Sequence, residues 1–198
     1  MPGMAARPTP TLAGLAAAWL LAGAACAQPV AYTLDPTHSS VTFEVLHFDT
    51  STLRGRFGPL EGIAELDRRA RRGEVSLTIP TRIVSTGLPV LDSRLHQGDL
   101  FASEAYPEAY FVARHFVFDG DSLREVRGEF TLRGISRPLA LRATSFSCGV
   151  HPLLERDWCG GDFEATLPRS AYGITHSLPF VADTVRLLVQ VEAIRQTP

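Results

Sequence analysis

The stretch VRGEFTLRGISRPLALRAT, residues 126–144, carries the clearest structural signal in the chain, because apolar and polar residues alternate along most of it. A period of two places one face of an extended strand against a core and the other against solvent. Glycine and proline interrupt the pattern between Gly134 and Pro138, which predicts a turn between two strands. The alternating positions are Val126, Gly128, Phe130 and Leu132 before the break, and Leu139, Leu141 and Ala143 after it.

The same alternation occurs along much of the remaining chain. Further segments with this pattern lie at residues 41–45, 75–79, 163–167 and 185–192. Turn-forming residues separate them at Gly58-Pro59, Arg72-Gly73, Asp119-Gly120-Asp121 and Gly160-Gly161. Short strands at near-regular spacing, joined by short turns, predict an all-β antiparallel protein of about eight or nine strands.

One stretch has a helical pattern instead. Leu91 and Leu95 are four residues apart with Asp92 near the start, so we expect a short helix within residues 91–105, interrupted near Gly98. A second short turn is expected at Arg169 to Tyr172. Since one helix cannot cover a whole sheet face, we predict that the sheet closes into an eight-stranded barrel with one short helix. Such a barrel can hold a small ligand, although a filled core fits the same pattern.

Composition narrows the class of protein. The chain has 198 residues, of which 45% are hydrophobic and 20% charged, typical of one globular domain. Its formal net charge is −2, and all 19 basic residues are arginine without a cluster. The sequence therefore argues against nucleic-acid binding, a polytopic membrane protein and a disordered chain.

The N-terminal residues 1–27 resemble a secretory signal peptide. Arg7 is their one charge, an apolar run extends from Leu12 to Ala25, and Ala25-Cys26-Ala27 is a small-x-small cleavage site. We expect cleavage after Ala27, which leaves residues 28–198 as one domain in the periplasm. The alternative is a lipoprotein acylated at Cys26, but Gly23 stands where such sites favour a large aliphatic residue.

Two cysteines remain after that cleavage, Cys148 and Cys159. An even number in an exported protein predicts a disulfide. A zinc site that includes His151 is the alternative, and its irregular ligand spacing is a weak signal.

Catalytic and cofactor motifs are absent from the sequence. The six histidines form neither an H-x-x-x-H nor an H-E-x-x-H pattern, and neither a G-x-S-x-G motif nor a glycine-rich phosphate loop occurs. Asp92 and His96, four residues apart, could share a helix face and orient a general base. More often such a pair is a helix cap and a surface contact. We therefore predict no enzyme activity, no metal and no cofactor, and keep a lipid-modifying enzyme using these two residues as an alternative.

Five segments, in order, resemble the YceI-like family. They are DPTHSSVTF at 35–43, LHF at 46–48 with TLRGRF at 52–57, residues 92–101 followed by Tyr106-Pro107 and Phe111, VRGEFTLRGISRPL at 126–139, and RSAYGI at 169–174. The fourth segment is the most specific, and the resemblance extends over residues 31–194. It departs from the family pattern at Arg94, where many members have histidine, and His96 lies two residues further on.

The resemblance implies an extended lipocalin-like barrel in the periplasm that binds a long apolar chain, such as a polyisoprenoid, an isoprenoid quinone or a fatty amide, without catalysis. An envelope membrane, an envelope protein and a second copy of the chain are further candidate partners. The remaining alternative is an interaction module with a filled core. The residues expected to point inward and to bind the ligand are Phe43, Val45, Phe57, Leu77, Ile79, Tyr110, Val112, Phe116, Phe130, Leu141, Phe163 and Val189.

Overall fold

The computed structural model describes residue 3 and residues 28–197, so the predicted signal peptide lies almost entirely outside the described part. Residues 28–197 form eleven strands, one α-helix and one 3-10 turn. The strands are β1 (Val30–Leu34), β2 (Ser40–His47), β3 (Ser51–Phe57), β4 (Glu61–Asp67), β5 (Arg72–Pro80), β6 (Val84–Ser85), β7 (Glu108–Asp119), β8 (Ser122–Leu132), β9 (Ile135–Val150), β10 (Asp157–Pro168) and β11 (Val181–Arg195). The helical elements are α1 (Pro89–Leu95) and η1 (Arg169–Tyr172).

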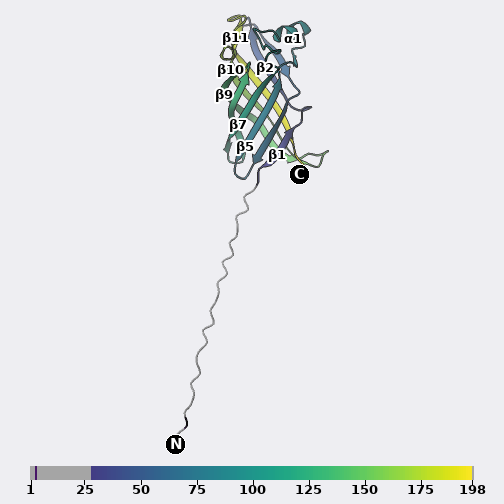
Figure 1. The fold of residues 1–198 in the computed structure, drawn as a ribbon, viewed down its shortest axis with the longest axis vertical. Coiled ribbons are helices and arrows are strands. Elements are labelled where there is room, and N and C mark those ends of the chain that lie inside the picture. Colours follow the sequence, from purple (N-terminus) through teal and green to yellow (C-terminus); the bar gives the residue numbers. More distant parts are fainter. Residues whose placement is uncertain (1–2, 4–27, 198) are drawn as a thin grey trace.

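Eight of the strands close into an antiparallel barrel, which confirms the predicted fold class. Their order is β1-β4-β5-β7-β8-β9-β10-β11, and β1 pairs with β11 to complete the ring. β1 pairs with residues 193–195 of β11, whereas β2 pairs with residues 181–190 of the same strand. Strands β3 and β6 follow β2 in the sheet. The barrel is elongated, with α1 at one end and the C-terminus at the other (Figure 1). We call the end with α1 the mouth end.

The segment from residue 126 to residue 144 forms most of the β8–β9 hairpin. Leu132 pairs with Ile135, so the turn is only Arg133-Gly134, and both residues have positive φ, 54° and 71°. Two such residues match the right-handed twist of a hairpin. The predicted break was therefore too wide, because β9 resumes at Ile135 and includes Pro138.

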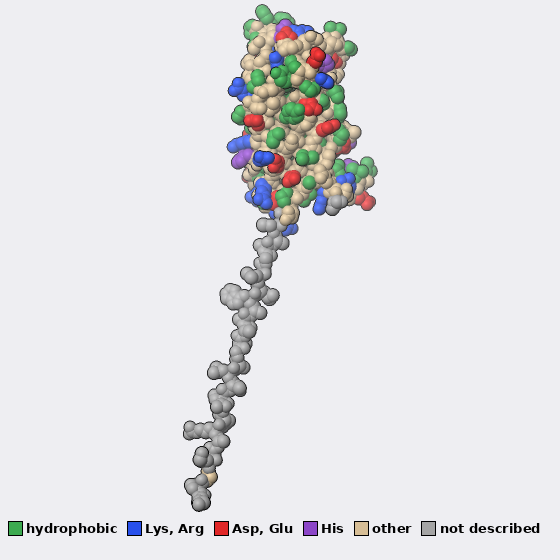
Figure 2. Space-filling model, viewed as in Figure 1, with side chains coloured by type: hydrophobic (Ala, Val, Ile, Leu, Met, Phe, Trp, Pro, Cys, Tyr) green, Lys and Arg blue, Asp and Glu red, His purple; other side chains and the backbone are tan. Residues whose placement is uncertain are grey.

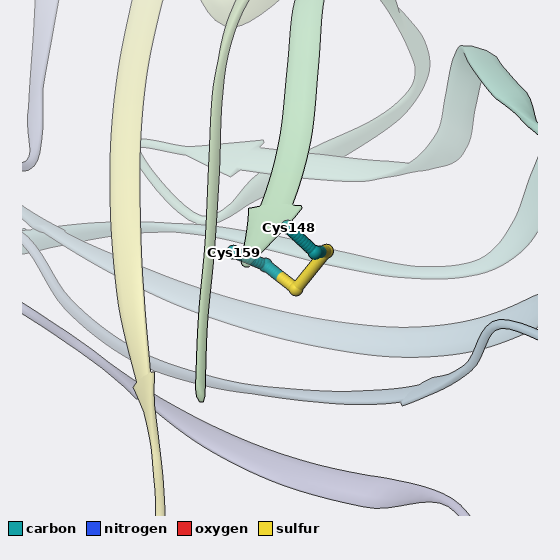
Figure 3. The surroundings of a disulfide bond; sticks show 2 residues. All are labelled: Cys148 and Cys159. Atoms are coloured by element: carbon teal, nitrogen blue, oxygen red, sulfur yellow. A yellow bond between two sulfur atoms is a disulfide. The ribbon is translucent and has the colours of Figure 1, made fainter. Parts of the chain in front are cut away.

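The region between the two cysteines is also more regular than a loop. β9 continues to Val150 and β10 resumes at Asp157, so the strands form a long hairpin. Cys148 and Cys159 are directly opposite each other in the register. They form the predicted disulfide, which joins the two strands near the hairpin tip (Figure 3).

The helix is shorter than the predicted segment. It begins with Pro89, whose fixed φ and missing N–H suit a first helical turn, and ends at Leu95. The rest of the predicted range, to residue 105, consists mainly of turns. The expected short turn at Arg169–Tyr172 is present as η1 and ends at Gly173, which has a left-handed φ of 74°.

The outer wall carries most of the charge. Acidic and basic side chains are interspersed on the face shown in Figure 2, without a large region of one sign. Glu44 accepts from Arg54 and Arg186, and Arg186 also reaches Glu164, so one ion-pair network crosses strands β3, β2, β11 and β10. None of the helices in residues 28–197 is long and apolar enough to cross a membrane.

Candidate functional site

The barrel encloses two apolar cavities. The larger, which we call the mouth cavity, has a volume of about 290 Å³ and is lined by residues of α1 at the mouth end. The smaller, which we call the inner cavity, has a volume of about 70 Å³ and lies toward the other end of the barrel. Tyr32 and Ala193 are among the residues that line it. The mouth cavity is at the lower limit of typical small-molecule sites. The barrel is therefore hollow rather than fully packed.

Period-two alternation explains how the strands build this wall. Along β2, for example, Val41, Phe43 and Val45 are buried and line the mouth cavity, while Glu44 joins the outer ion-pair network. Aromatic rings narrow the space near α1, because Phe101 packs edge-on against Phe43 and Phe57 at centroid distances of 6.0 and 5.1 Å. β2 therefore presents apolar side chains to the lumen and the charged Glu44 to the outer wall.

Ten of the twelve predicted ligand-binding residues line the cavities. Eight line the mouth cavity: Phe43, Val45, Phe57, Leu77, Ile79, Phe130, Leu141 and Val189. Phe116 and Phe163 line only the inner cavity. The inward positions inferred from alternation are thus brought together in one lumen.

Tyr110 and Val112 are placed elsewhere, and the expectation that they point inward was wrong. They are 42% and 41% exposed on the outer face of β7, whereas Ala109, Phe111 and Ala113 are buried. The larger apolar residues suggested the wrong face, because two of the three inward positions are alanines. Phe116 does point inward, since a bulge after Ala113 shifts the register of β7.

Several lining residues were not predicted. Phe111, Leu132, Leu139, Leu167 and Leu187 lie on the inward faces of their strands, so a complete count of alternating positions would have found them. Others come from outside the alternating segments, and no periodic signal marked them. These include Leu100, Phe101, Ile174, and the polar residues Arg94, Arg169 and His176.

The mouth carries a small polar cluster. Arg94, on α1, donates from Nη1 to Asp99 Oδ1 at 2.7 Å and from Nη2 to Asp99 Oδ2 at 2.6 Å. His176 Nδ1 lies 3.0 Å from the same Asp99 Oδ2. The hydrogen bonds from Arg94 lower the pKa of Asp99 to about 2. Arg94 and His176 line the mouth cavity, so this polar cluster borders the apolar space.

Arg169 anchors the segment that carries His176. Its guanidinium is buried and donates to three backbone carbonyls: Nε to Ala182 O at 2.9 Å, Nη1 to Ile174 O at 3.1 Å and Nη2 to Val181 O at 2.8 Å. Burial lowers the pKa of this arginine. The arrangement holds residues 174–182 against the mouth of the barrel.

Asp92 and His96 do not form the dyad considered from sequence. Asp92 Oδ1 accepts hydrogen bonds from the Thr86 N–H and Thr86 Oγ1, each at 2.7 Å, and no hydrogen bond or ion pair joins it to His96. His96 follows α1, and its buried Nε2 has no partner among residues 28–197. Within the same residues, no group of three or more His, Cys, Asp and Glu side chains is arranged to hold a metal ion.

Comparison with solved structures supports the barrel fold. BcnA of Burkholderia cenocepacia is similar with a TM-score of 0.67 at 18% identity, covering 80% of this chain and 98% of that protein. A polyisoprenoid-binding domain from Saccharophagus degradans, implicated in plant cell wall breakdown, gives a TM-score of 0.58 at 20% identity, covering 84% and 99%. These identities establish likeness of fold.

Sequence relatives match nearly the whole chain. A UPF0312 protein of Pseudomonas aeruginosa is 32% identical over 193 residues, covering 94% of this chain and 98% of the relative. Protein YceI of Escherichia coli O157:H7 is 29% identical over 189 residues, with coverage of 94% and 98%. The model of the YceI-like domain matches residues 32–193. This chain belongs to the YceI-like family.

Proposed function

We propose that this protein is an exported binding protein that holds a long-chain isoprenoid, of the polyprenyl or quinone type, or a similar lipid inside the barrel. Its role would be storage or transfer of that lipid. The observation that carries the proposal is the mouth cavity, an apolar space of about 290 Å³ lined by strand residues and by α1. The ten predicted residues that line the two cavities would contact the chain.

Burial of hydrocarbon can supply the affinity. Each buried methylene contributes about 0.8 kcal/mol, so a chain of moderate length needs no charged anchor. The polar groups at the mouth, Arg94, Asp99 and His176, would lie beside the head group. Family membership and the named polyisoprenoid-binding neighbour support a lipid as the ligand class.

Export is the second part of the proposal. Residues 1–27 have the composition of a signal peptide, and we propose cleavage after Ala27 and release into the periplasm. Acylation at Cys26 is the alternative processing. The disulfide between Cys148 and Cys159 is compatible with an oxidising compartment.

The alternatives receive less support from the described residues. The enzyme hypothesis required Asp92 to orient His96 as a general base. Asp92 instead accepts two hydrogen bonds from Thr86. The filled-core hypothesis does not describe a barrel with two cavities.

Mass spectrometry of an organic extract tests the proposal. The protein is purified from its native periplasm without detergent, and the extract is compared with one from an equal amount of an unrelated periplasmic protein. We expect a stoichiometric isoprenoid or long-chain lipid. A protein that carries no lipid, and that also fails to take up an added quinone or polyprenol, would overturn the proposal.

A further inference from the structure

The two cavities meet at a single layer of side chains. Leu77 on β5, Phe111 on β7, Leu141 on β9 and Val189 on β11 line both the mouth cavity and the inner cavity. Each therefore has one cavity on either side along the barrel. We call these four residues the dividing layer.

The two sides of this layer differ in chemistry. The mouth cavity includes Arg94, Arg169, His47 and His176 in its wall. The inner cavity has no charged side chain or histidine in its wall. A bound lipid would thus place its head group at the mouth and its chain end against the dividing layer.

We propose that the dividing layer selects ligands by chain length, and that the inner cavity is a second compartment which only longer chains enter. This inference rests on the proposed lipid-binding function. A chain that ends in the mouth cavity binds without rearrangement. A longer chain must displace side chains of the layer before its end reaches the inner cavity.

Phe111 has the largest side chain of the four residues in the layer. Its side chain is 2% exposed, and its inward neighbours on β7 are the small residues Ala109 and Ala113. On the adjacent strand, Gly128 pairs with Ala113 and presents no side chain, and a Cβ there would lie 2.6 Å from that of Ala113. The ring therefore has small inward neighbours on its own strand and faces the lumen between the two cavities.

The energetic consequence is a change in slope with chain length. Each methylene buried in the mouth cavity strengthens binding by about fourfold. Beyond the dividing layer, part of this gain is offset, because moving a packed aromatic ring disturbs its contacts. The affinity of longer chains should therefore rise less steeply.

The test is a series of isoprenols with one head group. Geraniol, farnesol, geranylgeraniol and a longer polyprenol compete with Nile red for the delipidated protein, and each Kd is measured. For the natural protein we expect affinity to rise with each isoprene unit and then level off. In Phe111→Ala the levelling should disappear, so that the affinity of the longest chain relative to that of geraniol in the same variant rises by at least about tenfold.

Two phenylalanines provide matched controls. Phe130 lines only the mouth cavity and pairs with Phe111 in the register of β7 and β8, whereas Phe116 lines only the inner cavity. Alanine at either position removes a phenylalanine ring that is not part of the dividing layer. Phe130→Ala should move the levelling to longer chains, and Phe116→Ala should leave its position unchanged. Phe111→Leu is the milder variant if Phe111→Ala does not fold, as judged by circular dichroism.

The outcomes separate the two proposals. The chain-length inference is wrong if affinity rises without levelling in the natural protein. It is also wrong if affinity levels at the same chain length in Phe111→Ala or Phe111→Leu as in the natural protein. In both cases the lipid-binding function stands. If none of the isoprenols displaces Nile red, the proposed function fails, and the inference with it.

Discussion

Replacing Arg169 with lysine should lower the free energy of unfolding by about 3 kcal/mol, because the guanidinium makes three buried or part-buried hydrogen bonds to carbonyls. The three acceptors, Ala182 O, Ile174 O and Val181 O, surround three different nitrogens of the planar group. Lysine retains the charge but concentrates its donors on one nitrogen.

The magnitude follows from counting the lost bonds. A hydrogen bond from a charged donor contributes about 1.5–3 kcal/mol. If lysine keeps one of the three hydrogen bonds, the two lost bonds total about 3–6 kcal/mol. We take the lower value because water can enter beside residues 174–182 and bond the carbonyls that lose their donor. For a domain of this size, 3 kcal/mol corresponds to a decrease in Tm of about 6–12 °C.

Thermal and urea unfolding followed by circular dichroism measure this change. The control is Arg142→Lys, since Arg142 pairs with Glu164 on the outer wall and its side chain is 63% exposed. That control should change stability by less than about 0.5 kcal/mol. A Tm for Arg169→Lys equal to that of the natural protein would refute the assignment of Arg169 as the anchor of residues 174–182.

Three further predictions concern the disulfide, the mouth cluster and the outer wall. Replacing Cys148 and Cys159 with serine should lower the free energy of unfolding by about 3 kcal/mol in the chain-entropy model, and unchanged urea unfolding would contradict this. The pKa of Asp99 is lowered to about 2, so the contribution of this carboxylate to stability is present above its ordinary pKa and is lost as pH falls through about 2. Arg94→Met should raise the pKa of Asp99, measured by a carbon-13 NMR titration. An unchanged pKa would exclude the ion pair as the cause of the lowered value. Tyr110→Ser, on the outer face, should leave lipid affinity unchanged, and a clear loss would mean that this face takes part in binding.

The barrel and most of its lining could be predicted from sequence, because alternation reports which face of each strand is buried. Alternation did not identify the inward face of β7, where Tyr110 and Val112 point outward while Ala109 and Ala113 point inward. Side-chain size is a poor guide to direction when both faces of a strand are apolar. The bulge after Ala113 shifts which residues of β7 point inward, and no sequence signal marked it.

The polar mouth could not be predicted for a different reason. Arg94 and His176 are 82 residues apart, and both meet Asp99 only because α1 and the segment before β11 lie at the same end of the barrel. Such proximity depends on the closed topology. The division of the lumen likewise depends on which strands face one another across the barrel.

A ligand that lies inside the barrel should lose affinity when a larger side chain fills the mouth cavity. Leu139 lines that cavity, whereas Ala140, the next residue on β9, is exposed on the outer face. Titration of the delipidated protein with geranylgeraniol compares Leu139→Trp with the matched variant Ala140→Trp, after circular dichroism has shown that both are folded. We predict that Leu139→Trp weakens binding by at least about tenfold while Ala140→Trp binds as the natural protein does. A folded Leu139→Trp protein with unchanged affinity would show that the ligand does not occupy the mouth cavity.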